Sequence, residues 1–190
     1  MKATSVIGIT GTPGTGKKTV GRAVAKKLGY EFLEINHLAK KLGAEVGKRD
    51  TEIEIETSII YEKMPRLLKG KKTVVVGHLL PHSIPDNSVD YVAVLRCSPQ
   101  ELIERYTERR YPKRKVKANV VVEAIDMCLS DALIKYNNSK IAEIDTTGRN
   151  IAAVAEEVME KLKNPKERTF GGVNWLHSMA EDAKMRKYLK

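Results

Sequence analysis

A glycine-rich stretch near the N-terminus, GTPGTGKKT at residues 11–19, has the residue types of a phosphate-binding loop. Gly11, Gly16 and Lys17 fit the spacing G-x-x-x-x-G-K-[ST], in which backbone N–H groups surround phosphates and the lysine reaches the β- and γ-phosphates. The last position departs from the pattern, because Lys18 stands where a Ser or Thr hydroxyl would hold Mg²⁺. The alternative interpretation is an ordinary glycine-rich turn, so the elements around the stretch decide between the two.

The elements on either side of this stretch are those that a phosphate loop requires. The apolar run SVIGIT at residues 5–10 predicts a buried strand. Residues 18–28 carry apolar side chains at helical spacing, and Gly29 marks the end of that helix. The order of strand, glycine loop and helix favours phosphate binding, with the positive end of the helix dipole facing the anion.

The remainder of the chain alternates between strand and helix patterns. Apolar runs predict four more strands, at residues 31–35, 73–77, 90–96 and 141–145. Helical patterns fall at residues 37–42, 58–68, 98–109, 119–136 and 150–162. This alternation predicts an α/β fold with a parallel sheet, helices on both of its faces and the ligand at the carboxyl ends of the strands.

Two segments between these elements could cover a bound ligand. Residues 43–57 mix glycine with charges, and their alternation at 52–56 would also suit a strand; we expect a mobile insert over the site. Residues 109–117 contain six basic side chains in nine. Beside a phosphate loop they favour a lid that neutralises a transferring phosphoryl group, although a solvated basic face has the same composition.

Three histidines need separate interpretations. His78 follows the strand at 73–77 and so reaches the same sheet edge as the glycine loop, where a functional role and simple packing are equally compatible with the sequence. We expect His37 and His82 at the surface.

Composition limits the possible partners and compartment. The 190 residues include 34 Lys and Arg against 24 Asp and Glu, which gives a net charge of +10. That charge suits acidic partners such as nucleotides or RNA, or equally a highly charged, heat-adapted surface. Cys97 and Cys128 both lie in apolar stretches and predict buried free thiols. No apolar run approaches the roughly 20 residues of a membrane span, and no signal sequence is seen, so we expect a cytoplasmic protein without membrane contact.

Several pieces of the chain together resemble the adenylate kinase isoenzyme 6-like family, the archaeal and nuclear branch of nucleoside monophosphate kinases. The resemblance covers most of residues 4–162, and VLRCSPQELIERYTERRY at 94–111 is its most specific part. The other pieces are GTPGTGKKT, the pair Gly77-His78, then Asn119, Glu123 and EIDTTGR at 143–149.

This resemblance implies an architecture and an activity. It implies a P-loop NTPase fold of the nucleoside monophosphate kinase type, with a five-stranded parallel sheet in the order 2-3-1-4-5. The core would span residues 1–163, with a monophosphate-binding insert at about 34–57 and a lid at about 108–118; residues 164–190 would form a C-terminal tail. It also implies transfer of the ATP γ-phosphoryl group to AMP, ATPase activity, and a role in maturing the small ribosomal subunit through a small-subunit ribosomal protein and possibly rRNA.

Two other functions suit the same residues. One is an ATP-gated ribosome assembly factor with little kinase activity, for which the basic lid and tail would contact RNA or a ribosomal protein. The other is a kinase for a different small acceptor, because one core serves several acceptors. The tail residues themselves have apolar side chains at loose helical spacing, so we expect the tail to dock on its own domain or a second copy rather than on RNA.

The resemblance also assigns roles to residues by position. It implies Lys17, His78 and Arg109 as catalytic residues, and it places Lys40 and His78 at AMP. Arg109 in the lid would also meet ATP. The residues implied to bind the ATP phosphates are Gly11, Thr12, Pro13, Gly14, Thr15, Gly16, Lys17, Lys18 and Thr19.

The metal site is where this chain departs from the family. The family has an acidic residue that helps to hold Mg²⁺ at the position of Val76, and Lys18 adds a cation close by. We therefore expect Mg²⁺ to be held mainly by water and phosphates, with Thr19 the only candidate side chain. Lys18 either substitutes in part for Mg²⁺ or forms an ion pair with an acid such as Glu54 or Glu56; simple solvent exposure is the alternative.

Overall fold

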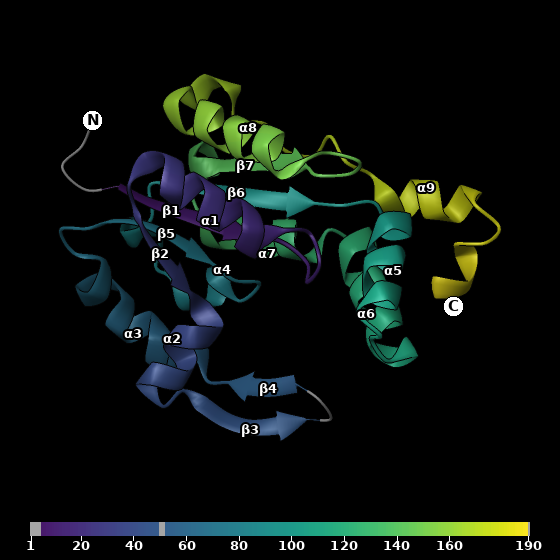
Figure 1. Ribbon diagram of the computed structural model, residues 1–190, viewed down its shortest axis with the longest axis horizontal. Coiled ribbons are helices and arrows are strands. Elements are labelled where there is room, and N and C mark those ends of the chain that lie inside the picture. Colours follow the sequence, from purple (N-terminus) through teal and green to yellow (C-terminus); the bar gives the residue numbers. More distant parts are fainter. Residues whose placement is uncertain (1–4, 50–51, 190) are drawn as a thin grey trace.

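A five-stranded parallel sheet forms the centre of the protein (Figure 1). The computed structural model describes residues 5–49 and 52–189. The strand order is β2-β5-β1-β6-β7, and every neighbouring pair is parallel. Because β3 and β4 lie outside this sheet, the order is the predicted 2-3-1-4-5, and the fold prediction is confirmed. The sheet strands are β1 (Ser5–Thr10), β2 (Glu31–Glu34), β5 (Lys72–Val76), β6 (Tyr91–Arg96) and β7 (Ile141–Asp145).

Helices cover both faces of the sheet, as the alternating pattern predicts (Figure 1). On one face α1 (Lys17–Leu28) packs beside α8 (Ile151–Lys163). The other face carries apolar side chains from four helices, which together bury a second core. These helices are α2 (Ile35–Leu42), α3 (Thr57–Leu68), α4 (Leu80–Ser83) and α7 (Met127–Lys135). Two short 3-10 turns, η1 (Asp86–Ser88) and η2 (Asn138–Lys140), lie in the connections. Strands enclosed on both faces explain the continuous apolar runs of the sequence.

The segment at residues 43–57 contains regular structure, so the choice of an irregular insert over a strand is wrong. It forms an antiparallel hairpin of β3 (Glu45–Arg49) and β4 (Glu52–Ile55), with residues 50–51 of the segment outside the described residues. The alternation at 52–56 is therefore that of a strand. Ile55 is the apolar residue that packs against the core, and the rest of the hairpin projects below the sheet (Figure 1).

The expected helix at 119–136 is two helices. α6 (Lys113–Ala124) begins within the basic run, and α7 follows after a break at Ile125 and Asp126, where Asp126 has a φ of 57°. Arg96 binds the chain at this break, because its Nη2 donates to the Glu123 carbonyl oxygen at 2.9 Å and also to the Asp126 carboxylate. The preceding helix, α5 (Pro99–Glu108), begins as predicted, with the Ser98 side chain accepting from the Glu101 N–H.

The C-terminal tail docks on its own chain, as predicted. It contains η3 (Pro165–Glu167), α9 (Trp175–Glu181) and η4 (Arg186–Tyr188). Met179 and Met185 are buried against α5 and α6 in one cluster with Cys97. Both cysteines are buried and free, which confirms that expectation. None of the helices formed by residues 5–49 and 52–189 is long and apolar enough to cross a membrane.

Candidate functional site

The glycine loop connects the carboxyl end of β1 to the first turn of α1. Gly11, Gly14 and Gly16 have φ angles of 137°, 95° and 92°, which residues other than glycine rarely adopt. A Cβ on Gly14 would also lie 2.9 Å from the Tyr106 ring. Glycine is thus required here both for backbone angle and for space, and the loop has the strand–loop–helix context of a phosphate cradle.

Lys17 is held inside this loop. Its Nζ donates to the Thr12 carbonyl oxygen at 2.8 Å, and the Thr15 hydroxyl donates to the same oxygen at 3.0 Å. Burial lowers the pKa of the Lys17 ammonium to about 8, although the charges of Cys128 and Glu123 act in the opposite direction. A phosphate group entering the loop would give this cation a stronger acceptor than the carbonyl oxygen.

α5 braces the outer side of the loop through two side chains that the sequence did not single out. Arg105 Nη1 donates to the Gly14 carbonyl oxygen at 2.7 Å, and the Tyr106 hydroxyl donates to the Pro13 carbonyl. Both residues lie within the specific stretch at 94–111. These two hydrogen bonds exist because α5 packs across the sheet edge beside the loop. The spacing of residues in the sequence does not reveal that packing.

A buried ionic network lies behind the loop. Arg96 is 1% exposed; its Nε donates to Glu123 at 2.8 Å, and its Nη1 donates to Glu143 at 2.5 Å. Glu123 Oε1 also accepts the backbone N–H of Cys97 at 3.1 Å. The network joins the end of β6 to α6 and β7, and so fixes α6 to the sheet.

A thiol lies between that network and the loop. The Cys128 Sγ is 3.8 Å from the Thr12 hydroxyl oxygen. Burial raises the pKa of Cys128, although the positive charge of Lys17 lowers it. The raised pKa favours the neutral thiol, which packs against the loop.

A second ionic group lies at the mouth of the loop. Lys18 Nζ is 2.8 Å from Glu34 Oε2, with side-chain exposures of 53% and 28%. Of the alternatives for Lys18, an ion pair is therefore formed, but its partner is Glu34 at the end of β2 and not Glu54 or Glu56, the two acids named as examples. The Glu56 side chain instead accepts from Ser58 at the start of α3. Glu54 and Glu56 belong to the segment at residues 43–57, whereas β2 ends directly beside α1.

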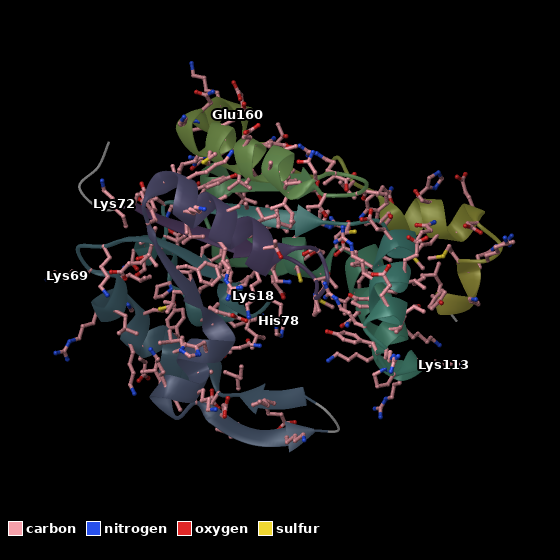
Figure 2. All side chains as sticks on the ribbon, in the orientation of Figure 1. Lys18, Lys69, Lys72, His78, Lys113 and Glu160 are labelled. Carbon is pink, nitrogen blue, oxygen red and sulfur yellow. The ribbon has the colours of Figure 1, made fainter. Side chains whose placement is uncertain are left out.

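Val76 lies next to this pair. It is the register partner of Glu34 in the sheet and is 2% exposed. Its side chain packs beneath α1, where a Cβ on Gly21 would come within 2.4 Å of it. Figure 2 shows Lys18 and His78 close together at this edge of the sheet, with Lys113 on the far side of the opening.

Two cavities open at this edge. A small one of about 160 Å³ lies at the loop mouth, and a larger one of about 480 Å³ extends between the hairpin and α6. Pro13, Asn36 and His78 line both, so the two cavities adjoin. The small cavity is also lined by Lys17, Lys18, Glu34, Val76 and Gly77. The larger one adds Glu45, Ile53, Ile55, Tyr111, Lys115, Asn119, Val122 and Cys128.

The structure brings some of the predicted site residues together and leaves others apart. Lys17, Lys18 and His78 share the small cavity. Arg109 caps the end of α5 and Lys40 lies on α2; both are exposed and neither lines these two cavities. Thr19 is exposed in the first turn of α1.

Two histidines lie outside the site, since His37 and His82 are at the surface, as expected. The distance from His82 Nε2 to Asp131 Oδ2 is 3.3 Å. Within the described part of the chain, no group of three or more His, Cys, Asp and Glu side chains is arranged to hold a metal ion.

Comparison with known proteins identifies the family of the chain. The family described as an AAA domain matches residues 7–126. A protein of Thermococcus gammatolerans named "Putative adenylate kinase" is 39% identical over 170 residues, which cover 90% of this chain and 92% of that protein. A protein of the same name from Methanocaldococcus jannaschii is 32% identical over 174 residues, covering 89% and 92%.

The chain belongs to this adenylate kinase-like family. Members of the wider fold are seen among solved structures. Shikimate kinase from Aquifex aeolicus has a TM-score of 0.55 at 15% identity and covers 85% of this chain and 98% of its own. A gluconokinase from Sinorhizobium meliloti has a TM-score of 0.54 at 17% identity, covering 86% and 94%. At these identities the likeness is one of fold, and it supports the P-loop kinase architecture.

Proposed function

We propose that the protein transfers the γ-phosphoryl group of ATP to AMP and releases two ADP molecules. The observation that carries the proposal is a pair of adjoining cavities: one lies at the phosphate loop, and the larger one, which shares Pro13 and His78 with it, has a volume of about 480 Å³ and could take a second substrate. A phosphoryl group held at the loop mouth would thus face an acceptor in the larger cavity. The names of the archaeal relatives support AMP as that acceptor.

The reaction would proceed as an in-line displacement. An oxygen of the AMP phosphate attacks the γ-phosphorus, the bond from that phosphorus to the β–γ bridging oxygen breaks, and its electron pair leaves with ADP. Lys17 moves from the Thr12 carbonyl to the β- and γ-phosphates and stabilises the charge on the transferring group. The loop amides hold the remaining phosphate oxygens. We expect ATP to keep its Mg²⁺ through water and phosphate oxygens.

The parts of the chain divide accordingly in this proposal. Residues 1–163 form the kinase core, with an acceptor-binding insert at 34–57 and a lid at 108–118, and residues 164–190 form a tail. The hairpin supplies the apolar wall of Ile53 and Ile55, while the lid side supplies Tyr111 and Lys115. Arg109 and Lys40 take the roles of ATP and AMP contacts only if the lid and insert close, because both are exposed outside the cavities in this conformation.

An acceptor screen tests this proposal. ATP is incubated with the protein and with AMP, GMP, CMP, UMP or a non-nucleotide alcohol, and nucleotide products are separated by chromatography. We expect ADP to form fastest with AMP, and Lys17→Ala to abolish its formation. Faster ATP consumption with another acceptor would reassign the substrate, and consumption independent of any acceptor would indicate an ATPase.

A second candidate is an ATP-gated factor in assembly of the small ribosomal subunit, acting in the cytoplasm. The observation that favours it is a set of exposed basic side chains on two elements that contact each other, Lys113 and Lys117 on α6 and Arg186 and Lys187 on η4. A ribosomal protein or rRNA would be retained in one nucleotide state and released in another. Equal retention by the wild type and by Lys17→Ala, in ATP and in ADP, would count against such gating.

A further inference from the structure

The described residues do not fit the usual way in which a P-loop holds Mg²⁺. The pattern requires a hydroxyl directly after the loop lysine, and Lys18 stands there. A carboxylate from a neighbouring strand end would help, but the end of β5 is Val76, which is buried beneath α1 at Gly21. Mg²⁺ prefers oxygen ligands. In the places of the hydroxyl and the carboxylate, the loop mouth has the ammonium group of Lys18 and the alkyl side chain of Val76.

The structure does place a cation and a carboxylate at the same mouth. Lys18 and Glu34 form an ion pair of 2.8 Å and line the small cavity together with Lys17. Glu34 is the neighbour of Val76 across the sheet, so the carboxylate lies one strand away from its usual position. Because this carboxylate is matched by Lys18, a metal ion is not needed to neutralise it.

We propose that the Lys18–Glu34 pair takes over the electrostatic role of a metal site at this loop. When ATP binds, Lys18 leaves Glu34 for the polyphosphate, so that two lysines of one helix end face the phosphates. ATP binding then depends only weakly on Mg²⁺. This inference rests on the nucleotide-binding part of the proposed function and is independent of the acceptor.

The exposure of the pair makes this exchange possible. The Lys18 side chain is half exposed and flexible, so the ion pair with Glu34 holds its ammonium group only weakly. The polyphosphate carries several negative charges at the positive end of α1, which attract an ammonium group more strongly than one solvated carboxylate does. Glu34 therefore competes with ATP for Lys18, and it also repels the phosphates.

Calorimetric titration with ATP tests the inference directly. Affinities are measured in saturating MgCl₂ and in excess EDTA, for the wild type and for Lys18→Thr/Val76→Asp, which restores the usual hydroxyl and carboxylate. We expect the wild-type affinity to change less than about threefold between the two media, and that of the double variant to fall at least about tenfold in EDTA. Lys18→Thr alone provides the same comparison if the buried aspartate prevents folding.

Matched single variants separate the pair from general charge effects. In EDTA, Lys18→Met should weaken ATP binding at least about tenfold, whereas Lys26→Met, which removes the same charge at the exposed far end of α1, should change it less than about twofold. Glu34→Gln should tighten binding in EDTA.

The results that overturn the inference are distinct from failure of the proposed function. A wild type that loses affinity in EDTA as steeply as Lys18→Thr/Val76→Asp, or Lys18→Met equal to Lys26→Met, would refute it. A wild type that binds ATP equally in both media but makes no ADP from AMP would leave the inference standing and overturn the proposed acceptor. No ATP binding in either medium would refute both.

Discussion

Two ionic groups flank the phosphate loop, and they differ in almost every physical respect. Behind the loop, Arg96 is enclosed and bonded to Glu123 and Glu143, two carboxylates that are themselves buried. At the mouth, Lys18 and Glu34 form a single contact in which both side chains reach solvent. One group has fixed geometry and several partners; the other has one partner that another anion could replace.

The difference shows that ion pairs of similar residue types can either support the loop or exchange partners when a ligand arrives. A buried charge must keep its partners, because the interior offers it no water in their place. An exposed pair contributes little to stability and can therefore be broken at little cost. The loop is thus held rigidly from behind, while its mouth can reorganise when a nucleotide arrives.

The largest expected effect is on the buried side. Arg96→Met leaves Glu123 and Glu143 enclosed without their cation, so we expect the free energy of unfolding to fall by about 3–5 kcal/mol. Urea denaturation followed by circular dichroism measures this loss. Arg96→Met/Glu123→Gln/Glu143→Gln removes the charges together and should recover part of it. A loss below about 1 kcal/mol for Arg96→Met would contradict the comparison.

An intermediate effect concerns Lys17, which lies between the two groups. Its pKa of about 8 in the free protein lies below its ordinary 10.5, and bound phosphates should raise it again. ATP binding therefore takes up a proton above pH 8, and affinity falls as the pH rises through this value. Below pH 8 the lysine is already charged, and the affinity should be level.

Titration calorimetry in buffers of different ionisation enthalpy measures the proton uptake. Lys17→Arg keeps its charge throughout this range and serves as the control, because a guanidinium does not titrate there. An ATP affinity of the wild type that is the same at pH 7 and pH 9.5 would rule out the lowered pKa.

The smallest expected effect is on stability at the mouth. Lys18→Met and Glu34→Gln should each change the free energy of unfolding by less than about 0.5–1 kcal/mol, and so should their combination. A double-mutant cycle by urea denaturation gives the coupling energy of the pair. Coupling as large as that of the Arg96 network would mean that the mouth is a fixed support as well.

The sequence was sufficient for the sheet and for the phosphate loop, because both depend on local patterns. Continuous apolar runs such as residues 5–10 identify strands covered on both faces, and the glycine spacing at 11–16 identifies the loop. The strand order came from the family resemblance. The hairpin at 45–55 was not recognised as strands, because charges and glycine masked a correct alternation at 52–56.

The ionic groups could not be derived in the same way. Arg96 contacts residues 27 and 47 positions further along the chain, and only the packed sheet brings them together. Arg96 also binds the chain at the break between α6 and α7, and a helical pattern alone ran through that break. An ion pair was one of the alternatives for Lys18, but its partner depended on which strand ends beside α1, and that is a property of the assembled sheet.

The fate of the γ-phosphoryl group distinguishes a phosphotransferase from an ATPase. ATP labelled in its γ-phosphate is mixed with excess AMP and protein, and the labelled products are separated after a single turnover. Our account predicts that the label appears in ADP, and that Lys17→Ala leaves it in ATP. Label found chiefly in inorganic phosphate in the presence of AMP would contradict a phosphotransferase and indicate an ATPase.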